Sequence, residues 1–236
     1  IEIPASVKKI GKHAFPSNTA IRNKSSVMIP PISDFDIEHG TVKRYLGKSN
    51  SVVIPTGVTS IGNNAFSRCN TLTAIVIPDG ITSIGEKAFE FCKSLTSIKI
   101  PNGVIRIGND AFACCFSLPS IEIPDSVTSI GDDAFACCYA LASIEIPDGV
   151  TSIGEGTFAC CKSLTSIEIP DSVASIGNEA FTDCYSLTSI EIPDSVTSIG
   201  IFAFWKCFSL KSVKIPKSVT HIGEDAFLSD TKIIRV

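Results

Sequence analysis

An Ile-Pro dipeptide recurs every 23 residues along most of this 236-residue chain. The prolines that share this register are Pro55, Pro78, Pro101, Pro124, Pro147, Pro170, Pro193 and Pro216. A fixed period in the twenties predicts one small supersecondary unit per repeat, and each unit must stack on its neighbour to bury its apolar side. We therefore expect one elongated body that works as an extended surface rather than through a deep catalytic pocket.

Each repeat contains a short strand, a corner, a second extended segment and a turn. Residues 164–170, Leu-Thr-Ser-Ile-Glu-Ile-Pro, alternate apolar and polar side chains with the period of a strand. Pro170 ends this strand because proline has no N–H to continue a ladder. The recurring glycine, Gly177 in this repeat, predicts a turn with positive φ. Residues 178–184 are long enough for one helical turn that places Phe181 in the core.

Phenylalanine and glycine occupy fixed columns of the repeat. The phenylalanines are Phe66, Phe89, Phe112, Phe135, Phe158, Phe181, Phe204 and Phe227. The glycines are Gly62, Gly85, Gly108, Gly131, Gly154, Gly177, Gly200 and Gly223. We expect each phenylalanine to be buried and to contribute about 2 kcal/mol to folding.

The full pattern, L-x-x-I-x-I-P-x-x-V-x-x-I-G-x-x-A-F-x-x-C, resembles the 23-residue leucine-rich repeat of the BspA-like, or Treponema-type, surface proteins. The resemblance covers residues 51–236 without a gap, and residues 35–55 resemble the unit with which such arrays often begin. It implies a right-handed leucine-rich-repeat β-solenoid. We expect a parallel β-sheet on one face and short strands or one-turn helices on the other.

The repeat register slips once, near the start of the chain. Pro4 and Pro55 are 51 residues apart, which is two periods plus five residues. We therefore expect residues 1–50 to hold irregular N-terminal repeats and a junction. Residues 51–236 hold the regular repeats, continuous with the first part as one elongated body.

The chain opens with a repeat strand. Residues 1–4 match residues 121–124, Ile-Glu-Ile-Pro, so we expect a fragment or a processed product. No signal-peptide pattern is present at this end. No apolar run approaches the roughly 18 residues that a membrane helix needs, so we expect no membrane span in this segment.

Acidic residues are concentrated in the middle of the chain. Residues 79–194 hold 17 acidic and five basic residues, whereas residues 1–78 have a net charge of +5 and residues 195–236 of +3. Nucleic-acid binding needs a basic stripe that displaces counterions from phosphates. We therefore expect no nucleic-acid partner.

Cysteine occupies two adjacent columns. The first column holds Cys69, Cys92, Cys115, Cys138, Cys161, Cys184 and Cys207, and the second holds Cys114, Cys137 and Cys160. The first continues as Asn18 and Asp230, and side chains stacked about 4.8 Å apart point in parallel. We therefore expect buried, hydrogen-bonding thiols rather than disulfides. The second column also contains Arg68 and Asp183, so it should be partly exposed, an oxidation or soft-metal site in principle, although no C-x-x-C spacing supports a metal.

The residue between the two strand isoleucines points away from the core. Four consecutive repeats place a glutamate there, namely Glu122, Glu145, Glu168 and Glu191. A parallel column follows the prolines and contains Asp125, Asp148, Asp171 and Asp194. Like charges about 5 Å apart in water repel by about 0.8 kcal/mol before screening, which a basic partner or a cation would relieve. The alternative is a solvated face of duplicated repeats.

Aromatic residues and lysines alternate just after the first cysteine column. This column contains Asn70, Lys93, Phe116, Tyr139, Lys162, Tyr185 and Phe208. Aromatic side chains are enriched at protein interfaces, but they could equally pack on one another and seal the turn. We choose Phe116, Tyr139, Tyr185 and Phe208, together with the glutamates, as candidate partner-binding residues.

Catalysis has little support in the sequence. His13, His39 and His221 lie in different columns without a nucleophile beside them, and no phosphate-binding loop is present. Stacked carboxylates near 5 Å apart could mimic a retaining glycosidase, but no pocket is evident that would raise one pKa. We expect no enzyme activity, no catalytic residue, no metal and no cofactor, with a carbohydrate-active β-solenoid as a remote alternative.

The sequence therefore predicts a non-catalytic repeat array that binds a protein partner. The resemblance implies an adhesin-like protein that is cell-surface or secreted, with a host extracellular-matrix or cell-surface protein as its partner. The alternative is a structural spacer that holds another domain away from the cell surface.

Overall fold

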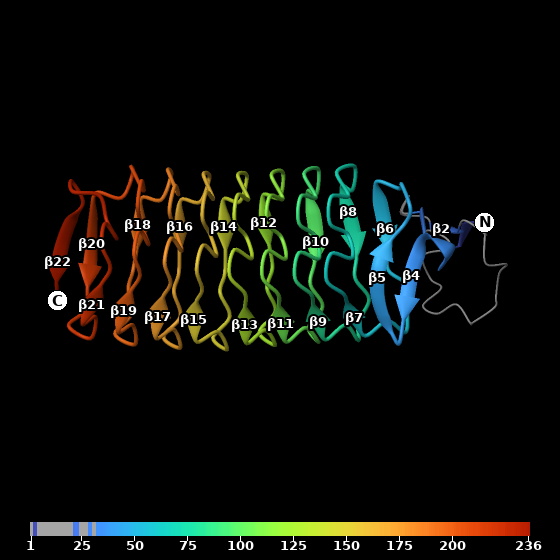
Figure 1. Cartoon of the computed structure of the whole chain (residues 1–236), viewed down its shortest axis with the longest axis horizontal. Coiled ribbons are helices and arrows are strands. Elements are labelled where there is room, and N and C mark those ends of the chain that lie inside the picture. Colours follow the sequence, from blue (N-terminus) through green and yellow to red (C-terminus); the bar gives the residue numbers. More distant parts are fainter. Residues whose placement is uncertain (1, 4–20, 24–27, 30–31) are drawn as a thin grey trace.

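The structure, a computed structural model, describes residues 2–3, 21–23, 28–29 and 32–236. It is an elongated parallel β-solenoid in which short strands stack along the long axis (Figure 1), so the predicted fold class is confirmed. We call one 23-residue turn of the solenoid a coil. The predictions that concern Pro4, His13 and Asn18 lie outside the described residues.

Short parallel strands lie on the side of each coil that carries the Ile-Pro corner, and we call them together sheet 1. Its strands are β6 (Ser51–Val53), β8 (Ala74–Val76), β10 (Ser97–Lys99), β12 (Ser120–Ile121), β14 (Ser143–Ile144), β16 (Ser166–Ile167), β18 (Ser189–Ile190), β20 (Ser212–Ile215) and β22 (Lys232–Arg235). They pair in four runs, which are joined by single bridges between Lys99 and Glu122, Glu145 and Glu168, and Glu191 and Lys214. Equivalent residues of successive coils pair directly, as Ile98 does with Ile75. In sheet 1, equivalent positions of the repeat therefore lie side by side in successive coils.

The strands before the glycines form a second parallel ladder, sheet 2. Its strands are β5 (Thr41–Tyr45), β7 (Ser60–Ile61), β9 (Ser83–Ile84), β11 (Arg106–Ile107), β13 (Ser129–Ile130), β15 (Ser152–Ile153), β17 (Ser175–Ile176), β19 (Ser198–Ile199) and β21 (His221–Ile222). They pair in two runs, β5 to β13 and β15 to β21. Sheet 2 places one buried or half-buried isoleucine per regular coil against the core.

An antiparallel hairpin precedes the regular coils. The 3₁₀ turn η1 (Ile32–Asp34) leads into β4 (Phe35–Glu38), which pairs with β5. The rings of Phe35 and Tyr45 pack on each other and on Phe66, so the hairpin covers the first ring of the aromatic core.

Three further strands lie before the hairpin. In this part β1 (Glu2–Ile3) pairs in parallel with β2 (Ile21–Asn23), and β2 pairs antiparallel with β3 (Met28–Ile29). The division of the chain at residue 50 stays a prediction.

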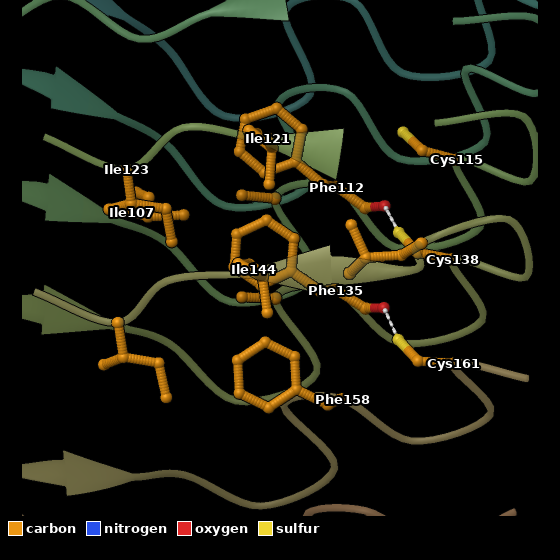
Figure 2. Close-up of a cluster of buried hydrophobic side chains, with 14 of the residues drawn as sticks. Ile107, Phe112, Cys115, Ile121, Ile123, Phe135, Cys138, Ile144, Phe158 and Cys161 are labelled. Carbon is orange, nitrogen blue, oxygen red and sulfur yellow. Dashed lines mark hydrogen bonds between the residues drawn. The ribbon is translucent and has the colours of Figure 1, made fainter. Parts of the chain in front are cut away.

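The phenylalanine column forms one continuous stack through the core (Figure 2). Successive ring centroids from Phe66 to Phe227 lie 4.9 to 5.7 Å apart, with ring planes within 17° of each other. Every ring of the stack is buried. Isoleucines from both sheets and one leucine per coil pack around the stack, so each coil completes the burial of its neighbours.

The predicted role of the glycine column is wrong. None of these glycines has positive φ. Among the described residues, the glycines with positive φ are Gly40, in the hairpin before the regular coils, and Gly57, Gly80 and Gly156, at other positions of the repeat. The glycines are needed because adjacent coils approach too closely there for a side chain. A Cβ on Gly177 would lie 2.6 Å from the carbonyl carbon of Gly154, on the preceding coil.

The predicted helical turn after the glycine is also wrong, because residues 178–184 form non-helical turns. The N–H groups of Glu179 and Asp183 donate along the solenoid axis, to the carbonyls of Ile201 and Trp205 on the next coil. A helix would use these donors within its own chain. The axial hydrogen bonds therefore replace the intrachain ones.

Two left-handed residues per coil allow this turn. The first left-handed column contains Asn64, Lys87, Asp110, Asp133, Gly156, Glu179, Phe202 and Asp225. The second contains Arg68, Phe91, Cys114, Cys137, Cys160, Asp183 and Lys206. Most of these residues are not glycine, so the surrounding hydrogen bonds must offset the cost of positive φ.

The aromatic stack predicts a strong dependence of stability on a central ring. Phe135 is fully buried between Phe112 and Phe158, so Phe135→Ala should lower the free energy of unfolding by about 3–5 kcal/mol in urea titrations. Phe208 is 53% exposed, and Phe208→Ala should cost less than about 1 kcal/mol. Similar losses in the two variants would contradict a stack that stabilises the core.

Candidate functional site

The four glutamates form a ladder on the outer face of sheet 1. Glu122 lies between Ile121 and Ile123, which are buried, while its own side chain is exposed, and the same alternation holds in the next three coils. Glu145 and Glu168 pair directly across adjacent coils. We call Glu122, Glu145, Glu168 and Glu191 the glutamate ladder.

Lysines bound the glutamate ladder at both ends. Lys99 pairs in the backbone ladder with Glu122, and Lys214 pairs with Glu191. Within residues 32–236, no ion pair involves a side chain of the glutamate ladder. The four carboxylates are therefore available to cationic groups from outside the chain.

A groove of about 680 Å³ runs between the glutamate ladder and the aspartate column. Glu145 and Glu168 line it together with Asp125, Asp148 and Asp171. Proline and isoleucine side chains of the same coils contribute apolar surface. This combination suits a partner segment with ammonium or guanidinium groups on an apolar stem, since such groups donate charge-assisted hydrogen bonds to carboxylates.

The four predicted aromatic residues lie along one edge of the solenoid, where their rings form two pairs. The rings of Phe116 and Tyr139 stack with centroids 4.7 Å apart, and those of Tyr185 and Phe208 lie 5.5 Å apart. Lys162 connects the two pairs, because its Nζ lies 4.3 Å from the Tyr139 centroid and 5.7 Å from that of Tyr185. The rings therefore pack along the edge, yet Tyr139, Tyr185 and Phe208 remain exposed.

The aromatic edge extends further toward the N-terminus than the sequence predicted. Lys93 Nζ lies 5.7 Å from the Phe116 centroid and 5.8 Å from that of Phe91, and the Arg68 guanidinium lies 4.9 Å from the Phe91 ring. Phe91 belongs to the second cysteine column, whereas the predicted aromatic residues all come from the column that follows the first cysteine column. A pattern within that single column could not indicate Phe91. We call this continuous line from Arg68 to Phe208 the aromatic edge.

Both tyrosines of the aromatic edge have a raised pKa. Electrostatic interaction with the neighbouring Cys137 raises the pKa of Tyr139, with burial contributing less. A hydrogen bond to Asp183 raises the pKa of Tyr185. Both phenols therefore stay protonated at neutral pH, and the hydroxyl oxygen of each can accept a hydrogen bond from a partner.

Six of the seven thiols of the first cysteine column form the predicted buried, hydrogen-bonded ladder, whereas Cys69 is half-buried. The thiol of Cys138 donates to the carbonyl of Phe112 at 3.2 Å, and that of Cys161 donates to the carbonyl of Phe135 at 3.3 Å (Figure 2). Cys92, Cys115, Cys184 and Cys207 make the same contact. All ten cysteines are free thiols.

The second cysteine column is half-buried, as its composition predicts. Within the described residues, no group of three or more His, Cys, Asp or Glu side chains is arranged to hold a metal ion.

The same part of the chain contains no helix long and apolar enough to cross a bilayer.

Comparison with protein families finds one match. The family model described as "BspA type Leucine rich repeat region (6 copies)" matches residues 44–161 and 105–234. The comparison with curated proteins finds no match.

Solved leucine-rich repeat structures are similar to this chain. A leucine-rich repeat protein from Bacteroides ovatus is 32% identical with a TM-score of 0.75, over 83% of this chain and 55% of that one. The Treponema pallidum leucine-rich repeat protein is 31% identical with a TM-score of 0.73, over 77% of this chain and 90% of that one. A protein from Eubacterium ventriosum is 26% identical with a TM-score of 0.52, over 78% and 61% of the two chains. This chain thus spans about half the length of the Bacteroides ovatus protein.

The buried thiols predict a loss of stability at alkaline pH. Burial raises the pKa of Cys207 to about 12 and raises those of Cys115, Cys161 and Cys184 well above the ordinary value. The unfolded chain loses these protons above a pKa of about 8.5, whereas the folded chain retains them. Their stabilising effect is therefore complete below about pH 8.5 and is lost as pH rises toward 12, by about 1.4 kcal/mol per pH unit for each thiol.

Urea titrations between about pH 8.5 and 10 measure this slope. The free energy of unfolding of Cys138→Ser should fall less steeply with pH than that of the wild type, because serine releases no proton in this range. An equal slope in the two proteins would contradict the proposed linkage.

Proposed function

The chain belongs to the BspA-type leucine-rich repeat family, and from this premise we propose that it is a non-catalytic array that binds a protein partner. We propose further that it works at the cell surface or as a secreted segment, as an adhesin-like part of a longer protein. The location follows from its resemblance to BspA-like surface proteins. The partner is a host extracellular-matrix or cell-surface protein.

The glutamate ladder is the observation that carries this proposal. Four exposed carboxylates repeat in register on adjacent coils, and within residues 32–236 no ion pair involves them. Each adjacent pair repels by about 0.8 kcal/mol in water before screening. A basic segment of the partner would remove this repulsion and gain charge-assisted hydrogen bonds in the groove.

The aromatic edge supplies the apolar part of the proposed interface. Tyr139, Tyr185 and Phe208 are partly exposed and are already held by contacts with neighbouring rings and by Lys162. These side chains would therefore lose little conformational entropy when a partner binds. Rigid aromatic residues beside a charged rim are typical of protein-binding surfaces.

Binding to purified extracellular-matrix and cell-surface proteins, measured by surface plasmon resonance, tests the proposal. The variant carrying Glu122→Gln, Glu145→Gln, Glu168→Gln and Glu191→Gln should lose at least about tenfold in affinity, or about 1.4 kcal/mol. The wild-type affinity should fall as salt rises, because exposed charges are screened over about 8 Å at physiological ionic strength.

A matched control removes the same number of charges elsewhere. Glu86, Glu155, Glu179 and Glu224 are exposed and lie in the turn that follows sheet 2. Changing these four to Gln should leave affinity within about twofold of the wild type. Equal losses in both variants would show that only net charge matters. If the wild type bound no partner, the structural spacer would be the better account of the chain.

A further inference from the structure

Three half-buried cysteines occupy one column on consecutive coils, and the proposed protein-binding function does not use them. Cys114, Cys137 and Cys160 all have left-handed backbones, with φ of 60°, 58° and 60°. Their N–H groups make equivalent bonds of 2.7 to 2.8 Å to the next coil, to Ala136, Ala159 and Thr182 respectively. The three side chains therefore leave the backbone in the same direction, one coil apart.

Cys137 is the shared neighbour of the other two thiols in this column, and it raises the pKa of both Cys114 and Cys160. Backbones in register are separated by about 4.8 Å, which lies inside the Cα–Cα range of about 4.4–6.8 Å that a disulfide requires. Cys114 and Cys160 are two coils apart, about twice that distance, so they cannot bridge directly.

We propose that Cys114, Cys137 and Cys160 form a reversible redox site in which Cys137 makes a disulfide with one neighbour at a time. The oxidant is a low-molecular-weight disulfide, for which oxidised glutathione is the probe. One protein thiolate attacks a glutathione sulfur and releases one glutathione thiolate. A neighbouring thiolate then attacks the protein sulfur and releases the second. The two protein thiols lose two protons and two electrons, and the two glutathione thiols that form take them up.

The bridge is reversible because the repeat geometry strains it. Parallel side chains must converge to bring their Cβ atoms to about 3.8 Å, and such strain makes a disulfide easier to reduce. The third thiol also stays next to the bridge. In the Cys137–Cys160 form, Cys114 can attack the sulfur of Cys137, form Cys114–Cys137 and release Cys160 as a thiol. The disulfide can therefore move by one coil without an external reagent.

The surroundings of the site slow its oxidation at neutral pH. Burial and the Cys137 thiol raise the pKa of Cys114 to about 12, with Glu90 raising it and Lys93 lowering it. Burial and Cys137 raise the pKa of Cys160 to about 11, with Asp183 raising it and Lys162 lowering it. Since the thiolate is the attacking form, the reaction should accelerate as pH rises from about 7 to 9.

The other thiols do not compete for this reaction. Six of them are fully buried and donate to backbone carbonyls of the preceding coil. Cys69 is half-buried, but the second column carries Arg68 and Phe91 at its neighbouring positions, so the only thiol beside it is the buried Cys92.

Thiol counting with mass spectrometry tests this proposal on the folded chain. The reduced protein is incubated with oxidised glutathione, alkylated in denaturant and weighed. We expect the wild type to fall from ten alkylated thiols to eight, with peptide mapping placing a bridge at Cys137. Cys114→Ser and Cys160→Ser should each still form one bridge, through the remaining neighbour of Cys137. Reduced glutathione should restore all the thiols.

Two variants separate this site from other oxidation. Cys137→Ser should form no bridge, and serine fits the column because Ser229 occupies its last position. Cys69→Ser should still form the bridge and serves as the control. A bridge that persists in Cys137→Ser, or a wild type that carries only glutathione adducts without a bridge, would overturn the proposal.

Discussion

Backbone hydrogen bonds between successive coils hold every column of this protein in register. They run along the axis in both sheets and in the turns, as from Gly177 N to Ile153 O and from Phe181 N to Ala203 O, both at 2.8 Å. Since each regular coil has 23 residues, an amino acid at one position of the repeat lies next to the same position of the regular coils before and after it. The interaction between two like side chains is therefore repeated at each coil along the molecule, whether it stabilises or destabilises the fold.

The same register has opposite effects in the core and on the surface. Inside, it stacks the phenylalanine rings and lets the six buried thiols of the first cysteine column donate to carbonyls of the preceding coil. Outside, it places four glutamates side by side, with a lysine only at each end of the row and no ion pair to them within residues 32–236. Such stacked carboxylates contribute nothing to the core. Their repulsion is tolerated because the buried stack and the axial hydrogen bonds exceed it in free energy, and it favours a basic partner.

The sequence predicted the columns better than it predicted the backbone between them. The sequence predicts the 23-residue period, the alternation in the strands and the buried Phe and Cys columns, because each depends on one type of residue that recurs at the same position of the repeat. Gly177 was misread because positive φ is the commonest reason for a conserved-looking turn glycine, whereas here the backbone of Gly154 excludes a Cβ. The left-handed residues carry a weak signal, Asn and Asp at Asn64, Asp110 and Asp133. Axial hydrogen bonds, which replace the expected helical turn, join residues in different coils and leave no local pattern.

The most direct test of the register is a distance between two spin labels on sheet 1, introduced through non-natural amino acids at Val76 and Lys214, which are both exposed. These positions are six coils apart, so we predict one narrow distribution near 29 Å between the two backbones, from about 4.8 Å per coil. Deletion of residues 146–168, one complete period, should shorten this distance by about 4.8 Å and leave the distribution narrow. A broad distribution in the intact chain, or a distance that does not change after the deletion, would contradict the in-register stack.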